Sequence, residues 1–199
     1  LRDRKGSITG VFLENGESYF SKQVILTTGT FLNGVIHMGE ETIAAGRVGE
    51  PPSTSLAKDL RSYNLSMGRL KTGTPPRLDR RTINWNKLEK QLGDNVPEMF
   101  SEYNVSPNNE QVECRVTYTN SAIHELIKKN IKKSAMYSGK LDAKGPRYCP
   151  SIEHKVMRFS DRERHQIFLE PEGLDDNTVY PNGISTSLPE EVQEKIIKL

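Results

Sequence analysis

Residues 145–151, with the sequence GPRYCPS, place one of the two cysteines of this chain between two prolines. Proline fixes φ and cannot continue a helix, so the segment is predicted to be a stiff loop or a strand end. A thiol held in this way is poorly placed for core packing, and the neighbouring Arg147 favours the thiolate form of Cys149. The run therefore indicates a functional site.

Size and charge limit the classes of protein that the chain can represent. Its 199 residues are enough for one good core or parts of two domains. With 28 Lys and Arg against 26 Asp and Glu, the formal net charge is only +2, so any RNA contact must come from local patches. The start at Leu1 without an initiator methionine and the end inside an apolar-periodic segment predict a fragment of a longer chain.

The cysteines and histidines indicate neither a disulfide framework nor a metal site. Cys114 and Cys149 form no CxxC pair, and the four histidines lack the spacing of metal ligands. No hydrophobic run approaches membrane-spanning length. These features predict a soluble protein of a reducing compartment, with no membrane partner.

The first third of the chain has the pattern of a nucleotide-binding α/β domain. Residues 7–13 and 17–20 flank an Asn-Gly turn and predict a hairpin. Residues 23–30 then form an apolar stretch that predicts a buried parallel strand, with Thr28 and Gly29 at the end that faces a ligand crevice. A plain buried strand followed by a turn is the alternative, and it remains open on these residues alone.

Two glycine- and proline-containing segments follow. Ser53, after a double proline, is predicted to cap a helix, whose start either holds a phosphate or ribose or is a plain N-cap. Residues 68–77 combine three cations with glycines and prolines, and they are either an anion site or a solvated basic turn.

From about residue 78 the pattern changes to mixed α and β, which predicts a domain boundary near the second double proline. Residues 86–92 predict a short helix, and residues 94–109 a polar loop. Residues 112–118 alternate as a half-buried strand with Cys114 on its apolar face, so Cys114 is interpreted as structural. An amphipathic helix beginning at Asn120 or Ser121 carries lysines in its later turns, which either meet RNA phosphates or are simply solvated.

The strongest functional signal lies in residues 145–159. Arg147, Lys155 and Arg158 can hold a phosphate or stabilise a thiolate, and Glu153 or His154 can move a proton. Surface salt bridges and a spectator histidine are the alternatives. Residues 156–159 are predicted to anchor this loop as a strand, and residues 166–173 and 180–189 to form strands joined by turns. Residues 187–190 (SLPE) match a capping box for the last helix.

Five segments together make a family resemblance visible: residues 28–32, 68–77, 145–159, 166–173 and 180–189. They resemble the MnmG (GidA) family, the flavin-containing subunit of an enzyme that installs carboxymethylaminomethyl groups on the wobble uridine of certain tRNAs. The resemblance implies an α/β fold, part of a Rossmann-type FAD-binding domain plus an inserted mixed α/β domain. It assigns residues 1–71 to the FAD-binding domain and 72–199 to the insert, on the NAD and substrate side, with the C-terminal part of the protein missing.

The resemblance also implies roles for particular residues. Ser53 matches an FAD-contacting position, and Cys149 matches a cysteine implicated in activity; Thr28 and Gly29, placed at a ligand crevice by the strand pattern, are added as cofactor-binding candidates. The segment assigned to NAD binding in the family corresponds here to Gly145, Pro146, Arg147, Tyr148, Cys149, Pro150, Ser151, Ile152, Glu153, His154, Lys155, Val156, Met157, Arg158 and Phe159.

The implied activity is an FAD-dependent modification of tRNA at C5 of the wobble uridine. NADH reduces the FAD, methylenetetrahydrofolate supplies the one-carbon unit, and glycine or ammonium supplies nitrogen. The implied partners are the MnmE GTPase, tRNA and a second copy in a homodimer, and the fragment alone is expected to be inactive. The Cys149 thiolate would either add to the uracil ring, making C5 nucleophilic, or protonate and position the flavin adduct. A small-molecule FAD/NADH oxidoreductase and a non-catalytic tRNA-binding module are the alternative functions.

Overall fold

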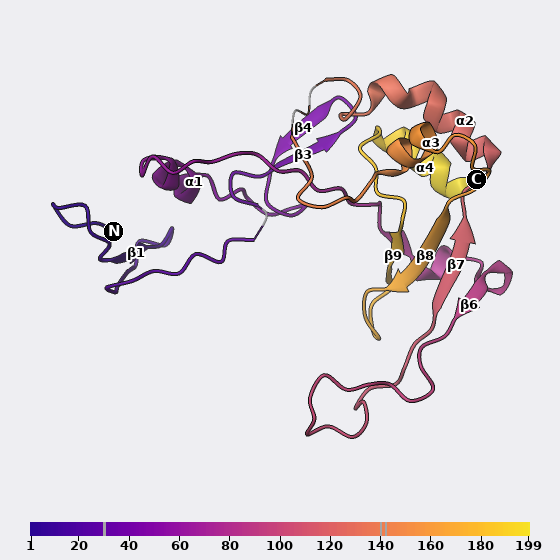
Figure 1. Ribbon diagram of the computed structural model, residues 1–199, viewed down its shortest axis with the longest axis horizontal. Helices are drawn as coiled ribbons and strands as arrows, with labels where there is room; N and C mark the ends of the chain where they lie inside the picture. Colours follow the sequence, from indigo (N-terminus) through magenta and orange to yellow (C-terminus); the bar gives the residue numbers. More distant parts are fainter. Residues whose placement is uncertain (30, 140, 142) are drawn as a thin grey trace. The chain divides into compact units, whose positions relative to one another are not determined.

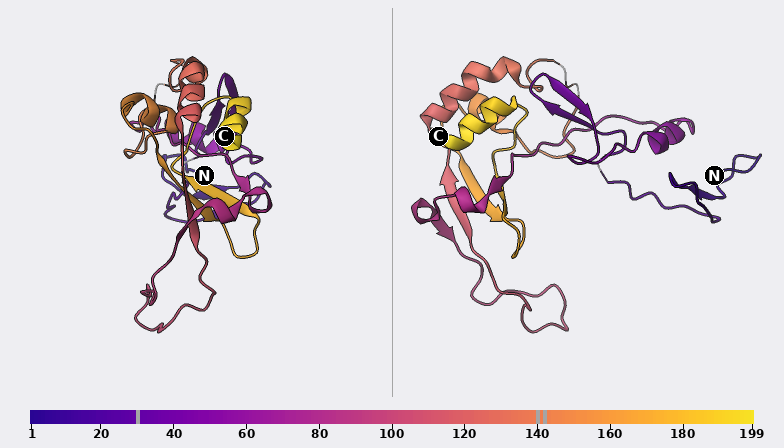
Figure 2. Two further views of the ribbon diagram at one scale, coloured as in Figure 1. Left: turned by 90° about the vertical axis from the view of Figure 1, so that its right-hand side faces the viewer. Right: turned by 180° about the vertical axis from the view of Figure 1, so that it is seen from behind.

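The computed structural model describes residues 1–29, 31–139, 141 and 143–199. The chain divides into two compact units: Leu1–Val35 with Ala44–Leu65, and Ile36–Ile43 with Ser66–Leu199. Thr30, part of the apolar stretch singled out above, lies outside the described residues. Figures 1 and 2 show the elements of each unit.

The first unit contains the predicted hairpin. Strands β1 (Gly10–Phe12) and β2 (Ser18–Phe20) pair antiparallel, and the turn between them uses Gly16 at a φ of 90°. This positive φ is readily reached only without a side chain, which explains the Asn-Gly signal. The unit also contains the predicted helix, α1 (Thr54–Arg61), with Ala57 buried on its inner face.

The buried strand predicted for residues 23–30 is wrong for the part that the structure describes. Residues 23–29 form no strand, and Ile25 is 87 % exposed. A parallel strand requires hydrogen-bonded neighbours on its edges, and no described segment pairs with this one. The stretch is apolar, but no element of the described chain buries it.

The second unit is built on a five-stranded antiparallel sheet in the order β5-β9-β8-β7-β6 (Figure 1). The strands are β5 (Leu78–Asp79), β6 (Glu89–Gln91), β7 (Cys114–Tyr118), β8 (Gln166–Pro171) and β9 (Thr178–Asn182). Short 3-10 turns lie at η1 (Arg80–Thr82), η2 (Trp85–Lys87) and η3 (Ile131–Lys133). A separate pair, β3 (Val35–Met38) and β4 (Glu41–Ala44), forms its own two-stranded sheet.

Three helices pack together at one end of this sheet (Figures 1 and 2): α2 (Ser121–Asn130), α3 (Ile152–Arg158) and α4 (Glu190–Lys198). Their apolar faces and the inner residues of β8 and β9 make one core. Burying each large aliphatic side chain in it contributes roughly 1.5–3 kcal/mol. The buried members are Ile123, Ile127, Ile152, Val156, Ile167, Leu169, Val179, Ile184, Leu188, Val192 and Ile196.

Three local predictions in this unit are wrong, each because tertiary contacts prevail over local signals. Residues 86–92 are not a helix but end η2 and form β6, since Lys90 finds a partner in Arg115 of β7. Residues 156–159 are not a strand; up to Arg158 they continue α3, whose apolar side is taken up by the core. The capping box at 187–190 does not form, because α4 begins after Pro189 and Ser187 bonds elsewhere.

Other local predictions are confirmed. The Asn120 side chain caps α2 by accepting the N–H of Ile123 at 2.9 Å. Residues 94–109 form no helix or strand. The strand predicted for residues 112–118 forms from Cys114 onward as β7. Cys114 is half-buried, and burial raises the pKa of its thiol, with a smaller contribution from the Glu170 carboxylate.

A buried histidine pair joins β7, α2 and the start of β8. Thr119 Oγ1 lies 2.8 Å from His124 Nε2 and accepts the N–H of His165 at 2.8 Å, and the two rings are 5.3 Å apart. Burial is the main cause that lowers the pKa of both histidines, and nearby positive charges lower it further. Both rings are therefore neutral in the stable fold.

We expect stability to fall on mild acidification because of this pair. The unfolded histidines bind protons near the ordinary pKa of 6.5, whereas the folded ones bind them only at lower pH. The free energy of unfolding should therefore decrease as the pH falls through about 6.5. Urea unfolding midpoints at about pH 7.5 and 5.5 test this in the wild type and in the H165Q variant, in which the decrease should be smaller. An unchanged wild-type midpoint would contradict the assignment.

Candidate functional site

The Cys149 segment is an exposed loop that leads directly into α3. Residues 145–149 are all exposed and form no helix or extended strand, as the prolines predict. The loop is tied at its end, because Ser151 accepts the N–H of His154 as the N-cap of α3 and Ile152 N donates to Ser185 O at 2.8 Å. Cys149 is thus an accessible thiol held by a rigid helix start.

Lys155 is the cation built into this site. It lies on α3 and its Nζ donates to Gly183 O at 2.7 Å, which fixes an otherwise flexible side chain. Burial lowers the pKa of Lys155, and its interaction with Cys149 partly opposes that shift.

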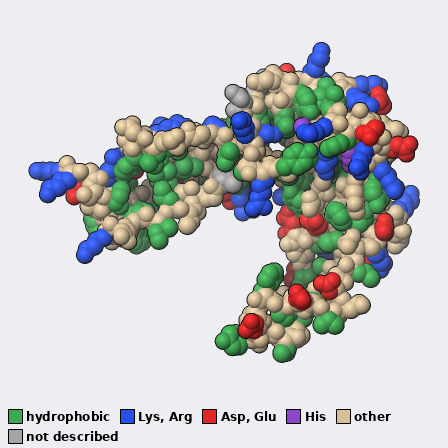
Figure 3. Space-filling view, viewed as in Figure 1, with side chains coloured by type: hydrophobic (Ala, Val, Ile, Leu, Met, Phe, Trp, Pro, Cys, Tyr) green, Lys and Arg blue, Asp and Glu red, His purple; other side chains and the backbone are tan. Residues whose placement is uncertain are grey.

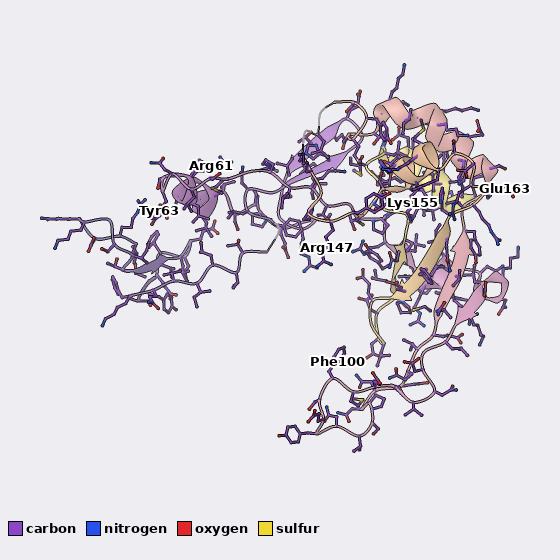
Figure 4. The ribbon with its side chains drawn as sticks, in the orientation of Figure 1. Arg61, Tyr63, Phe100, Arg147, Lys155 and Glu163 are labelled. Atoms are coloured by element: carbon purple, nitrogen blue, oxygen red, sulfur yellow. The ribbon has the colours of Figure 1, made fainter. Side chains whose placement is uncertain are left out.

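Arg147, predicted to help the thiolate, lies on the exposed loop and is itself exposed to solvent (Figure 4). The structure therefore shows Lys155 as the anchored cation of this segment, and it leaves Arg147 accessible to an anionic ligand.

The carbonyl that holds Lys155 requires glycine at position 183. Gly183 has a φ of 107°, and an added Cβ would lie 2.8 Å from Gln166 O and 3.6 Å from Lys155 Nζ. Sequence analysis missed this residue, because its role depends on a contact across 28 positions of sequence.

Glu153 is fully buried and ties three segments together. Its Oε1 accepts the N–H of Ser187 at 2.9 Å and the hydroxyl of Ser134 at 3.2 Å, and the two serine hydroxyls are 2.8 Å apart. The carboxylate therefore joins α3 to the end of η3 and to the segment before α4. Its Oε2 is buried and has no partner among the described residues.

Residues 145–159, predicted from the resemblance to bind NAD, divide into two groups in the structure. Ile152, Glu153 and Val156 point into the core, and His154 Nε2 is buried without a partner in the described part of the chain. A nicotinamide contact from this segment would use its accessible members. The exposed ones are Gly145, Pro146, Arg147, Tyr148, Cys149, Met157, Arg158 and Phe159, and Pro150, His154 and Lys155 are partly exposed.

The predicted flavin-side residues lie in the first unit. Ser53 precedes α1, but its side chain accepts no N–H of the helix. Its carbonyl oxygen accepts the N–H of Asn33 at 3.2 Å, and Ser53 and Leu32 form an isolated parallel β-bridge. Ser53, Thr28 and Gly29 are exposed. An uncommitted hydroxyl at a helix start fits a hydrogen bond to a dinucleotide, so the residues present are compatible with one.

Residues 68–77 are shaped mostly by contacts within the second unit. Lys71 N donates to Lys144 O at 3.0 Å, and Arg77 pairs with Glu172 and lies 4.3 Å over the ring of Tyr180. Arg77 is thus already paired with a carboxylate, which favours the structural interpretation for this cation.

No helix in the described residues is long and apolar enough to cross a membrane. Within the same residues, no cluster of three or more His, Cys, Asp or Glu side chains is arranged to hold a metal ion.

These residues define an α/β protein with an exposed thiol on a loop and an anchored lysine on the helix that follows. A sequence model of the family described as Glucose inhibited division protein A matches residues 1–199. The tRNA uridine 5-carboxymethylaminomethyl modification enzyme MnmG of Granulibacter bethesdensis is 58 % identical over 191 residues, 96 % of this chain and 30 % of that protein.

Two solved structures of Aquifex aeolicus GidA are also similar. The form I crystal gives a TM-score of 0.82 at 50 % identity and covers 94 % of this chain and 32 % of that one. The form II crystal gives 0.79 at 48 % identity, covering 94 % and 30 %. The chain thus spans about a third of the length of these relatives.

The chain belongs to the Glucose inhibited division protein A (GidA, MnmG) family. The predicted fold class is confirmed: it is α/β, with part of a Rossmann-type FAD-binding domain and an inserted mixed α/β domain.

We expect replacement of Glu153 by alanine to destabilise the second unit by about 1–3 kcal/mol, because the Ser187 N–H and the Ser134 hydroxyl lose a buried acceptor. Urea denaturation measures the change. E153Q keeps a carbonyl oxygen at this place and should cost less, and E163Q, at an exposed position labelled in Figure 4, serves as the control. Equal stability of E153A and E163Q would contradict the role given to the carboxylate.

Removing the charge of Lys155 should slow alkylation of Cys149. For the K155M variant we expect a decrease of about two- to fivefold near pH 7.5, the range of a partly solvated ion pair. Iodoacetamide labelling followed by peptide mass spectrometry measures each cysteine separately, so half-buried Cys114 is an internal reference. R147M is the matched control and should have the smaller effect; the reverse order would contradict the assignment of Lys155.

Proposed function

We propose that this chain is part of an FAD-dependent enzyme that adds the carboxymethylaminomethyl group at C5 of the wobble uridine of certain tRNAs. The observation that carries the proposal is the exposed Cys149 on the loop that leads into α3, the helix of the anchored Lys155, in a chain of the GidA family. The name of the Granulibacter relative, a tRNA uridine 5-carboxymethylaminomethyl modification enzyme, supports this substrate and product.

In this proposal, residues 1–71 belong to the FAD-binding domain and 72–199 to the inserted domain. Ser53, Thr28 and Gly29 contact FAD, and the accessible side of residues 145–159 receives NADH, with Arg147 on its phosphates. FAD supplies redox chemistry when bound, and methylenetetrahydrofolate supplies the one-carbon unit. MnmE, tRNA and a second copy of the protein are its partners in the cytoplasm, or in the mitochondrial matrix of a eukaryote.

Cys149 acts on the uracil ring. Its thiolate forms a bond to C6, and the electron pair of the C5–C6 double bond moves to C5 and O4, so that C5 becomes nucleophilic. After C5 has gained its new carbon, loss of the C5 proton and departure of the thiolate restore the double bond. Lys155 favours the thiolate at the start and stabilises it again when it leaves.

The thiol is tested by replacing Cys149 with serine in the protein at its full length. Nucleoside mass spectrometry of tRNA from a deletion strain complemented with C149S should show modification reduced by roughly 10²-fold or more, with normal bound flavin. C114S is the matched control and should retain activity. Full modification by C149S with normal FAD content would refute the catalytic role.

The same C149S preparation separates the chemical steps. A normal rate of flavin reduction by NADH places the thiol on the RNA side, whereas a slowed rate places it in hydride delivery. NADH oxidation with no change in tRNA nucleosides of the deletion strain would instead indicate a small-molecule oxidoreductase, and a colourless protein would indicate a tRNA-binding module.

A further inference from the structure

A segment to which the proposed chemistry assigns no role holds the Cys149 loop at both of its ends. Residues 70–74, here called the clamp segment, precede β5 and belong to the second unit, as the Cys149 loop does. At one end of the clamp segment Leu70 forms a parallel β-bridge with Lys144, and at the other Thr74 forms an antiparallel β-bridge with Thr186. These two bridges lie on either side of the loop in the sequence.

The first bridge fixes the beginning of the loop. Lys71 N donates to Lys144 O at 3.0 Å, directly before Gly145. The chain then turns tightly, because Cys149 N donates to Arg147 O at 3.1 Å and a Cβ at Gly145 would lie 2.9 Å from that same oxygen. The backbone that leads to the thiol therefore starts from a point that the clamp segment holds.

The second bridge fixes the end of the loop through Ser185. Ser185 is buried, and its carbonyl oxygen accepts the N–H of Ile152, the first residue of α3, at 2.8 Å. The side chain of Ser185 meets the clamp segment, because a Cβ at Gly73 would lie 3.3 Å from Ser185 Oγ and 3.4 Å from Ser185 Cβ. The next residue is also held, since Thr186 N donates to Thr74 O at 3.3 Å. Ser185 thus connects the clamp segment to the start of α3.

Space, and not backbone conformation, requires glycine at position 73. The φ of Gly73 lies outside the positive range, so alanine can adopt the same backbone. Contacts of 3.3–3.4 Å are closer than most Cβ contacts, so an added methyl group forces a neighbour to move by a few tenths of an ångström. Ser185 cannot move alone, because its carbonyl holds Ile152 and Thr186 is bridged to the clamp segment. A side chain at position 73 is therefore expected to displace the start of α3.

The clamp segment and the loop also carry cations. Lys71 Nζ lies 3.2 Å from Met136 Sδ, and Lys144 and Arg147 are exposed. Figure 3 shows Lys and Arg side chains at the place where Figure 4 labels Arg147. Because these cations and the thiol share one held backbone, a displacement of the clamp segment changes the positions of both.

We propose that the clamp segment sets the position of Cys149 for its attack on the base, and that Gly73 is a positioning residue of the reaction. Gly73 acts through Ser185 and Ile152 and not by contact with the reacting atoms. A misplacement of about 1 Å at a reacting group can lower a rate roughly 10²-fold, so a shift of a few tenths of an ångström is expected to be measurable. The kinetic part of this inference rests on the proposed role of Cys149, whereas the structural coupling does not.

Hydrogen exchange measured by mass spectrometry tests the coupling without the reaction. In the G73A variant of the protein at its full length, peptides covering residues 150–158 should exchange at least about threefold faster than in the wild type, because the acceptor of Ile152 N is displaced. G73A/S185G should return toward S185G alone, since it lacks both side-chain atoms that the alanine would meet. G173A, whose Cβ would make an ordinary contact of 3.5 Å, is the control. Unchanged exchange in G73A, or no recovery in the double variant at an unchanged urea midpoint, would overturn the coupling.

Kinetics of tRNA modification, with MnmE present, test the positioning role. G73A should lower kcat per bound flavin about three- to tenfold, with the KM for tRNA within about twofold of the wild type, and S185G should restore kcat in the double variant. A merely less stable protein loses bound flavin but keeps its kcat per flavin, and that result would refute the role of Gly73.

The C149S variant separates this inference from the proposed function. Loss of modification in C149S together with a wild-type kcat in G73A refutes the positioning role and leaves the proposed function standing. Full modification by C149S refutes the proposed function and with it the positioning role, and the exchange experiment then decides the coupling alone.

Discussion

The buried carboxylate of Glu153 is the interaction on which the second unit depends most. It holds η3, α3 and the segment before α4 through Ser134 and Ser187, in a core that is otherwise apolar. A buried carboxylate is costly unless it is hydrogen-bonded, so these partners and the fold require each other. The start of α3, and with it the Cys149 loop, takes its place from this contact.

Two sets of hydrogen bonds then position the groups of the Cys149 segment. Ser185 and Ser151 fix the beginning of α3, and Gly183 fixes the ammonium of Lys155. The thiol remains exposed while its cation is half-buried. This combination suits a nucleophile that must meet a large substrate, because access is kept open on one side and charge is supplied from the other.

Prediction and structure agree best for elements whose conformation is set by a few neighbouring residues. The Asn-Gly hairpin, the Asn120 cap and the proline-bounded Cys149 loop all follow from backbone preferences of a few residues. Predictions failed where a distant partner decides, as in β6, which pairs with β7, and in residues 156–158, whose apolar side joins α3 to the core. Ser187 resembles a helix cap in sequence, but Glu153 takes its N–H.

By itself, the sequence determined the family, the α/β class and the candidate thiol, because long motifs and two prolines around Cys149 carry that information locally. Only the tertiary structure decided that Lys155, and not Arg147, is the anchored cation, and that Ser134, Gly183 and Ser187 support the site. The reason is physical: burial and hydrogen bonding across tens of residues depend on which segments the core brings together, and no short pattern records that.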